Sequence, residues 1–203
     1  MNLNDKHIVA IMGPSGAGKT TLGDLLVLGN QFKVPKHCTT RKHRSDDKIG
    51  FYRYLSHEEY DKLFLENNFL ISSGDGPEIK KEYGNFYGVL KEDCIEALSE
   101  SDKIIIYVSY KDIEQIIELK KQGLNIDIVG ITFSDIEKGV KERLLSDTNR
   151  NHSEEDILRR ISIAISDNEK YRKLLEEHSK TIIYTDILGI EETYQKVCID
   201  LNL

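Results

Sequence analysis

Short apolar runs alternate with amphipathic segments along most of the chain. Four of the runs have the composition of buried parallel strands. They cover residues 8–12, 104–108, 126–133 and 182–184. Elsewhere apolar residues recur at three- and four-residue spacing, which is typical of helices with one buried face. These helical segments cover residues 20–28, 92–100, 111–122, 153–177 and 190–201. The alternation predicts an α/β fold, in which helices flank a parallel sheet.

Two segments interrupt this alternation. Residues 35–90 are rich in tyrosine, phenylalanine and glycine, which indicates a small mixed or antiparallel insertion. Residues 144–153 are polar and aperiodic, as expected of a loop over a site. Immediately after them, Ser153-Glu-Glu-Asp156 resembles a capping box at the start of the long helix. A length of 203 residues favours one domain that carries both segments.

Composition and charge exclude several classes of protein. A charged fraction of 31% and an apolar fraction of 39% suit a globular chain. The net charge of −7 argues against a surface for nucleic acid. The three cysteines are far apart and form no C-x-x-C pair, so neither a disulfide framework nor a zinc site is predicted. There is no signal-peptide pattern and no apolar run long enough to span a membrane, so we expect a cytoplasmic protein without a membrane partner.

Residues 13–20 read Gly-Pro-Ser-Gly-Ala-Gly-Lys-Thr, which is the G-x-x-x-x-G-K-[ST] pattern of a phosphate-binding P-loop. A predicted strand precedes the pattern and a predicted helix follows it, as the motif requires. Backbone N–H groups and the helix N-terminus would face phosphates. Lys19 would reach the β- and γ-phosphates of ATP, and the Thr20 hydroxyl would bind Mg²⁺. The expected ATP-binding residues are Gly13, Ser15, Gly16, Ala17, Gly18, Lys19, Thr20 and Thr21.

A second basic cluster lies at residues 39–44, Thr-Thr-Arg-Lys-His-Arg. Its two guanidinium groups, on Arg41 and Arg44, are spaced to bind a phosphate dianion by paired hydrogen bonds. A short basic run on its own is more often a solvated loop. The interpretation as a second phosphate site therefore depends on the P-loop.

The order of several motifs resembles the guanylate kinase family. GPSGAGKTTL is followed by TTRKHR, FYRYLSHEEYDKL and GNFYGV, and the later stretch ERLL…NR…SEEDILRRI…KY follows the family's lid and helix pattern. The resemblance implies a P-loop NTPase fold and a nucleoside monophosphate kinase that uses ATP and Mg²⁺. It also implies one domain, 1–203, with a core of 1–34 and 91–203, a mixed α+β insertion for the acceptor nucleotide over about 35–90, and a lid over about 144–157.

The same resemblance assigns roles to individual residues. The acceptor phosphate would be held by four side chains: Arg41, Arg44, Tyr52 and Tyr87. Charge on the transferring phosphoryl group would be neutralised by Lys19, Arg143, Arg150 and Arg160. Singly, each of the last three arginines would more often be a surface residue.

The positions that read guanine in the family are altered. His37 stands where the family has a serine, Ile71 where it has a glutamate, and Ser109 where it has an acidic residue at a strand end. We include His37 and Ser109 among the expected substrate-binding residues because they occupy positions that read guanine in the family. Losing paired polar contacts costs selectivity, so we expect an acceptor that carries a phosphate but whose guanine is not read. One of the acidic residues of segment 75–82 would replace the missing glutamate if that loop folds inward, although a solvated loop is the more common outcome.

Three functions therefore remain open. The first is a kinase that converts GMP or another nucleoside monophosphate to the diphosphate. The second is a sugar-phosphate kinase similar to the ribose 1,5-bisphosphate phosphokinases, which share the Tyr-Gly-Val turn and the non-acidic strand end but lack much of the pattern kept here at Arg44 and Tyr52. The third is a non-catalytic guanylate-kinase-like binding module. The complete P-loop and the lid arginines argue against the third.

Overall fold

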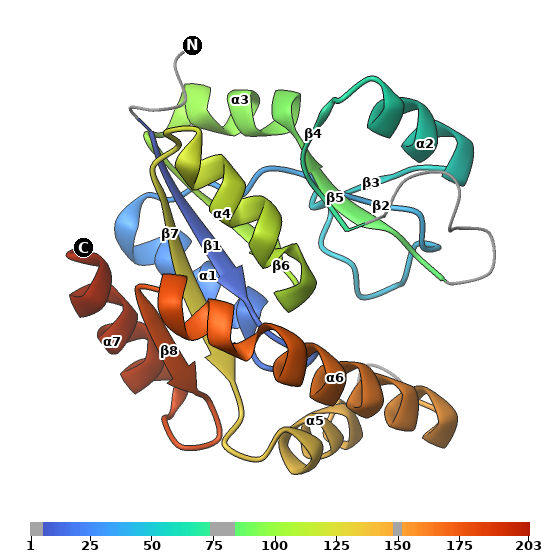
Figure 1. Cartoon of the computed structure of the whole chain (residues 1–203), viewed down its shortest axis with the longest axis vertical. Helices are drawn as coiled ribbons and strands as arrows, with labels where there is room; N and C mark the ends of the chain where they lie inside the picture. The colour runs from blue at the N-terminus through green and yellow to red at the C-terminus, as the bar shows by residue number, and fades with distance from the viewer. Residues whose placement is uncertain (1–5, 74–83, 148–151) are drawn as a thin grey trace.

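A four-stranded parallel sheet forms the centre of the protein (Figure 1). The computed structural model describes residues 6–73, 84–147 and 152–203. The strand order is β6-β1-β7-β8. Their bounds are β1 His7–Met12, β6 Lys103–Val108, β7 Ile126–Thr132 and β8 Thr181–Tyr184. These are the four strands that the apolar runs predict, and the α/β P-loop fold is confirmed.

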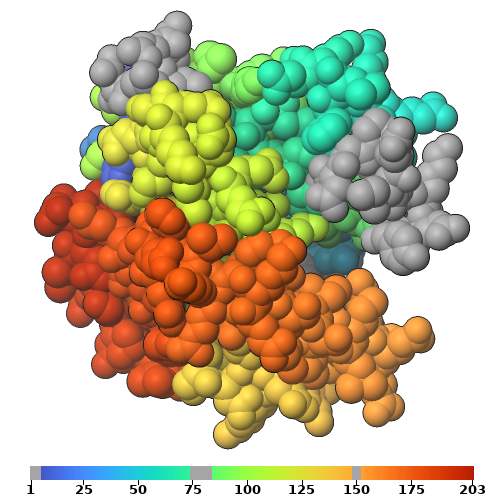
Figure 2. All heavy atoms as spheres, viewed as in Figure 1, coloured from blue at the N-terminus to red at the C-terminus, as the bar shows by residue number. Residues whose placement is uncertain are grey.

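Helices cover both faces of this sheet, which is why its strands are apolar throughout. One core cluster contains Ile8 and Ala10 of β1 and is covered by α3 (Lys91–Glu100), α4 (Ile113–Lys121) and the C-terminal half of α6 (Glu154–His178). The other contains Val9 and Ile11 and is covered by α1, α5, α7 and the N-terminal half of α6. The helix bounds are α1 Lys19–Asn30, α3 Lys91–Glu100, α4 Ile113–Lys121, α5 Ile136–Leu145, α6 Glu154–His178 and α7 Ile190–Leu201. Helices α4 and α6 lie side by side on the face drawn in Figure 2.

The helical pattern correctly predicts all of these helices except α5. The segment predicted at 111–122 begins with a 3₁₀ turn, η3 (Tyr110–Asp112), before α4. Helix α5 is missed because its buried stripe is short, consisting of Gly139, Val140 and Leu144. Its start nevertheless carries a recognisable signal, since the Asp135 side chain accepts a hydrogen bond from the backbone N–H of Lys138 at 3.0 Å.

A second, smaller sheet lies beside the first and has the order β3-β2-β5-β4. Strand β2 pairs in parallel with β3 and antiparallel with β5, so this sheet is mixed. Its elements are β2 His37–Thr39, β3 Tyr52–Tyr54, α2 His57–Leu65, β4 Phe69–Ser72 and β5 Tyr87–Leu90. All of them fall in the segment expected to bind the acceptor. None of the helices in the described part of the chain has both the length and the apolar character needed to cross a membrane.

Candidate active site

The loop of residues 13–18 joins β1 to α1 at the C-terminal edge of the parallel sheet, and the P-loop pattern continues into α1 with Lys19 and Thr20. Gly16 and Gly18 have φ values of 81° and 95°, in the left-handed region that favours glycine. Gly18 is the N-cap of α1 and has no side chain to cover the first turn. The first N–H groups of α1 therefore lie at the loop, where partial positive charge favours an anion.

The ammonium of Lys19 lies over this loop. Its Nζ donates hydrogen bonds to the carbonyl oxygens of Gly13 at 2.6 Å and Pro14 at 2.9 Å. Burial lowers the pKa of Lys19 to about 8, although the charge of Asp112 acts in the opposite direction. A buried cation is costly unless it is paired. This arrangement therefore favours a negatively charged ligand at the loop.

Two of the predicted lid arginines lie against the same loop. Arg143 is in the last turn of α5, and its Cβ is 3.0 Å from the place that a Cβ on Gly16 would take. Arg160 of α6 donates from Nη1 to the hydroxyl of Ser15 at 2.9 Å. The guanidinium of Arg160 and the base of the Arg143 side chain thus both lie against the loop that Lys19 covers.

The other predicted site residues to be placed are Arg150, the acidic residues of segment 75–82, Thr20 and Thr21. Arg150 and the acidic residues of segment 75–82 lie outside the described residues. Thr20 and Thr21 are exposed in the first turn of α1, beside Lys19. The parts of the chain that the structure describes contain no group of three His, Cys, Asp or Glu side chains able to hold a metal ion. Thr20, the residue predicted to bind Mg²⁺, presents its hydroxyl from the exposed first turn of α1.

Arg41 differs from the expectation of a phosphate-binding fork. Its guanidinium binds the carboxylate of Asp47 through two hydrogen bonds, Nη1–Oδ2 at 2.7 Å and Nη2–Oδ1 at 2.5 Å. Both side chains are almost completely buried. Asp47 also accepts from the Tyr54 hydroxyl at 2.5 Å and the Arg44 backbone N–H at 2.8 Å. The hydrogen bonds from Arg41 hold the pKa of Asp47 well below its usual range. In this structure the fork is thus occupied by a carboxylate of the same chain.

The tyrosines expected at the acceptor site lie around this pair. The Arg41 guanidinium carbon is 4.5 Å from the centre of the Tyr52 ring, a cation–π distance. Strand register places Thr39 of β2 opposite Tyr87 of β5, and Tyr87 is 40% exposed. Arg44 is half-buried, and its backbone rather than its side chain contacts Asp47. Tyr52 therefore lies beside Arg41, whereas Tyr87 lies at the opposite end of β2 from the position that pairs with Tyr52.

Both ring nitrogens of His37, one of the predicted substrate-binding residues, have partners within the protein. Its Nε2 accepts from the backbone N–H of Tyr107 at 3.0 Å, and its Nδ1 lies 3.0 Å from the carbonyl oxygen of Pro35, to which it donates. The ring stacks on Phe51 with a centroid distance of 5.1 Å. Burial lowers the pKa of His37 to about 4, although both backbone hydrogen bonds act to raise it. A neutral His37 thus ties β2 to β6 of the parallel sheet.

Ser109 and Ile71 also have partners inside the protein. Both the backbone N–H and the hydroxyl of Ser109 donate to Oδ2 of Asp112 at 2.8 Å. Ile71 is 2% exposed and packs in the main core beside Val89. Asp112 and Asp47 are not among the residues predicted for the site. Each follows a named residue by three positions, a spacing that favours local hydrogen bonds to the backbone.

The buried, neutral state of His37 predicts a pH dependence of stability. Its folded pKa of about 4 lies below the ordinary histidine pKa of 6.5, so between these pH values the unfolded chain binds a proton that the folded chain does not. The free energy of unfolding should therefore fall as the pH drops from about 7 to about 5, by roughly 2 kcal/mol from this group. Denaturant titrations at the two pH values measure it. His37→Gln should show a smaller difference, and His43→Gln, on an exposed residue, should match the wild type.

Comparison with known proteins gives the family. A model of the guanylate kinase family matches residues 5–198. A guanylate kinase of Clostridium tetani is 31% identical over 137 residues, which cover 67% of this chain and 62% of that protein. The match thus spans less than two thirds of that relative. A guanylate kinase of Fusobacterium nucleatum is 26% identical over 95% of this chain and 98% of its own.

A solved structure has the same fold. The crystal structure of guanylate kinase from Anaplasma phagocytophilum superposes with a TM-score of 0.66 and 16% identity, over 98% of this chain and 86% of that one. Together with the family match over residues 5–198, this settles the classification. The chain belongs to the guanylate kinase family.

Proposed function

We propose that the protein transfers the γ-phosphoryl group of ATP to a phosphomonoester, most directly a nucleoside monophosphate, so that ATP and the monophosphate give ADP and the diphosphate. The observation that carries the proposal is the convergence of Lys19 and Arg160, which both bond to the P-loop, with the Arg143 side chain beginning beside Gly16. Phosphoryl transfer is catalysed mainly by positioning and by stabilisation of negative charge, and this convergence supplies both. Related guanylate kinases support the same reaction type.

Each residue of the P-loop then has a role. Backbone N–H groups of the loop and of the first turn of α1 bind the phosphates of ATP. Lys19 exchanges its bonds to Gly13 and Pro14 for phosphate oxygens. The Thr20 hydroxyl holds Mg²⁺, which neutralises phosphate charge when bound. Arg143 and Arg160, and Arg150 by family resemblance, stabilise charge on the transferring group.

At the acceptor site, Arg44, Tyr52 and Tyr87 contact the phosphate of the acceptor. Arg41 joins them only if its bond to Asp47 opens, so we assign it first to holding the loop that presents Arg44. The base is not read as guanine because His37, Ile71 and Ser109 are all engaged within the protein. The same observation favours the second candidate, a sugar-phosphate kinase.

A panel of acceptors tests both the reaction and its specificity. With MgATP, we expect kcat/KM values for GMP, AMP, UMP and CMP to lie within about 100-fold of one another, because a site built to bond a base rejects analogues by 10⁴-fold or more. Ribose 1,5-bisphosphate in the same panel tests the second candidate. Strong selection of GMP over all other acceptors would contradict the assignment of His37, Ile71 and Ser109. ATP binding without transfer to any acceptor would favour the non-catalytic module.

A further inference from the structure

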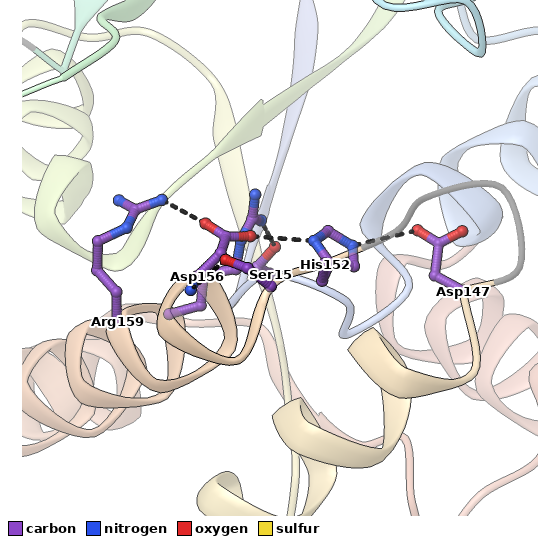
Figure 3. Close-up of polar contacts among 7 residues, drawn as sticks. Ser15, Asp147, His152, Asp156 and Arg159 are labelled. Atoms are coloured by element: carbon purple, nitrogen blue, oxygen red, sulfur yellow. Dashed lines mark hydrogen bonds and ion pairs between the residues drawn. The ribbon is translucent and has the colours of Figure 1, made fainter.

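A chain of polar contacts runs from the end of α5 to the P-loop (Figure 3). Asp147, just after α5, has its Oδ2 3.7 Å from Nε2 of His152, whose Nδ1 is 3.0 Å from Oδ2 of Asp156. The same Asp156 oxygen accepts from Nε of Arg160 at 2.7 Å. Arg160 completes the chain by donating from Nη1 to the Ser15 hydroxyl at 2.9 Å. Asp156 thus connects His152, in the segment predicted as a lid, to the P-loop through Arg160.

Asp156 has an unusual set of partners for a residue in the first turn of a helix. The sequence predicts that its carboxylate bonds back to Ser153 in a capping box. Only half of that box forms, since the Ser153 hydroxyl accepts from the Asp156 backbone N–H at 3.2 Å. The carboxylate instead contacts His152, Arg160 and Arg159, the last at 2.6 Å. Burial acts to raise the pKa of Asp156, but the hydrogen bonds from these three residues outweigh it and hold that pKa well below its usual range.

The two arginines that share Asp156 differ in their surroundings. The Arg159 side chain is 63% exposed, whereas that of Arg160 is 18% exposed. Arg160 is held at two places on its guanidinium, Nε by Asp156 and Nη1 by Ser15. A long, flexible side chain fixed at two atoms keeps a single direction and needs little reorganisation before a reaction. Arg159 lacks this second anchor among the contacts that the described chain makes.

We propose that Asp156 is a positioning residue that aims Arg160 at the phosphates on the P-loop. The inference rests on the proposed kinase function, because it concerns the direction of a charge that stabilises phosphoryl transfer. Asp156 need not touch ATP or the acceptor. Its contribution is to fix the arginine, so removing it should lower the rate of transfer more than it weakens acceptor binding.

The kinetic test is a double-mutant cycle between Asp156→Asn and Arg160→Ala. Misplacing a catalytic group by about 1 Å can cost about 100-fold, so we expect Asp156→Asn to lower kcat by about 10- to 100-fold and to change the KM of the acceptor less than about threefold. In the Arg160→Ala background the same substitution should change kcat less than about twofold, because its target is gone. An equal loss of kcat in both backgrounds would overturn the proposal.

Two variants control for simple weakening of α6. Ser153→Ala removes the cap of the helix but leaves the Asp156 carboxylate in place. Glu176→Gln removes an ion pair of similar geometry on the same helix, in which Arg172 Nε donates to Glu176 at 2.7 Å. Both should retain kcat within about threefold of the wild type, since neither touches Arg160. If Ser153→Ala lowers kcat as much as Asp156→Asn does, helix stability alone explains the effect.

A spectroscopic readout separates this inference from the proposed function. In ¹H–¹⁵N spectra the Nε–H signal of Arg160, assigned with Arg160→Lys, should be sharp and slow to exchange in the wild type and in Ser153→Ala. It should be broadened or lost in Asp156→Asn. An unchanged signal in Asp156→Asn would overturn the positioning role. If the wild type transfers no phosphate to any acceptor while Asp156→Asn still loses the signal, the kinase assignment is refuted and the contact between Asp156 and Arg160 is established.

Discussion

Lys19→Ala is expected to lower kcat by at least about 10³-fold, which corresponds to about 4 kcal/mol of transition-state stabilisation. The Lys19 ammonium belongs to the P-loop itself and lies over it, bonded to the carbonyl oxygens of Gly13 and Pro14. Phosphoryl transfer places developing negative charge at this position, and alanine supplies nothing to balance it. Initial rates with saturating MgATP and the best acceptor of the panel measure the loss.

The fold should survive this change. Burial lowers the pKa of Lys19 to about 8, which means that the folded protein holds the charged form at a cost. Removing the charge should therefore leave the melting temperature equal to or above that of the wild type. Lys196→Ala, an exposed residue of α7, is the matched control and should retain full activity. Activity of Lys19→Ala within about tenfold of the wild type would rule out the P-loop mechanism.

Sequence periodicity was sufficient for most of the fold because parallel strands buried on both faces are apolar throughout. It was insufficient for α5, where only three residues are buried and one of them is Gly139. The small sheet could be predicted only as mixed. Its strands have three or four residues each, too few to show a period.

The sequence specifies the geometry of the site best where one segment of chain forms it. Gly16, Gly18 and Lys19 belong to one loop, and a complete motif specifies that loop. Predictions were weaker where a side chain's partner comes from elsewhere in the structure. The ring of His37 accepts a hydrogen bond from the backbone of Tyr107 in the other sheet, and the guanidinium of Arg41 donates to Asp47. A residue's type shows what it can bind, whereas its partner depends on the packing around it.

Arg41→Ala should destabilise the protein by about 3–5 kcal/mol, rather than act only on acceptor binding. The Arg41 and Asp47 side chains are 4% and 3% exposed, so the substitution leaves a buried carboxylate without its cation. Breaking a buried ion pair from one side has this cost because the remaining charge stays desolvated. Denaturant titration measures the free energy of unfolding, and the KM of the acceptor should rise as well because Arg44 is presented by the same loop.

Two further variants separate the ion pair from the phosphate site. Arg41→Ala combined with Asp47→Ala should be more stable than Arg41→Ala alone, because the double variant buries no unpaired charge. Arg44→Ala keeps the Arg41–Asp47 pair and should raise the KM of the acceptor with little loss of stability, about 1 kcal/mol or less. If Arg41→Ala unfolds with a free energy within about 1 kcal/mol of the wild type while its acceptor KM rises steeply, then Arg41 is a phosphate ligand after all. Its bond to Asp47 would then be one that the acceptor phosphate displaces.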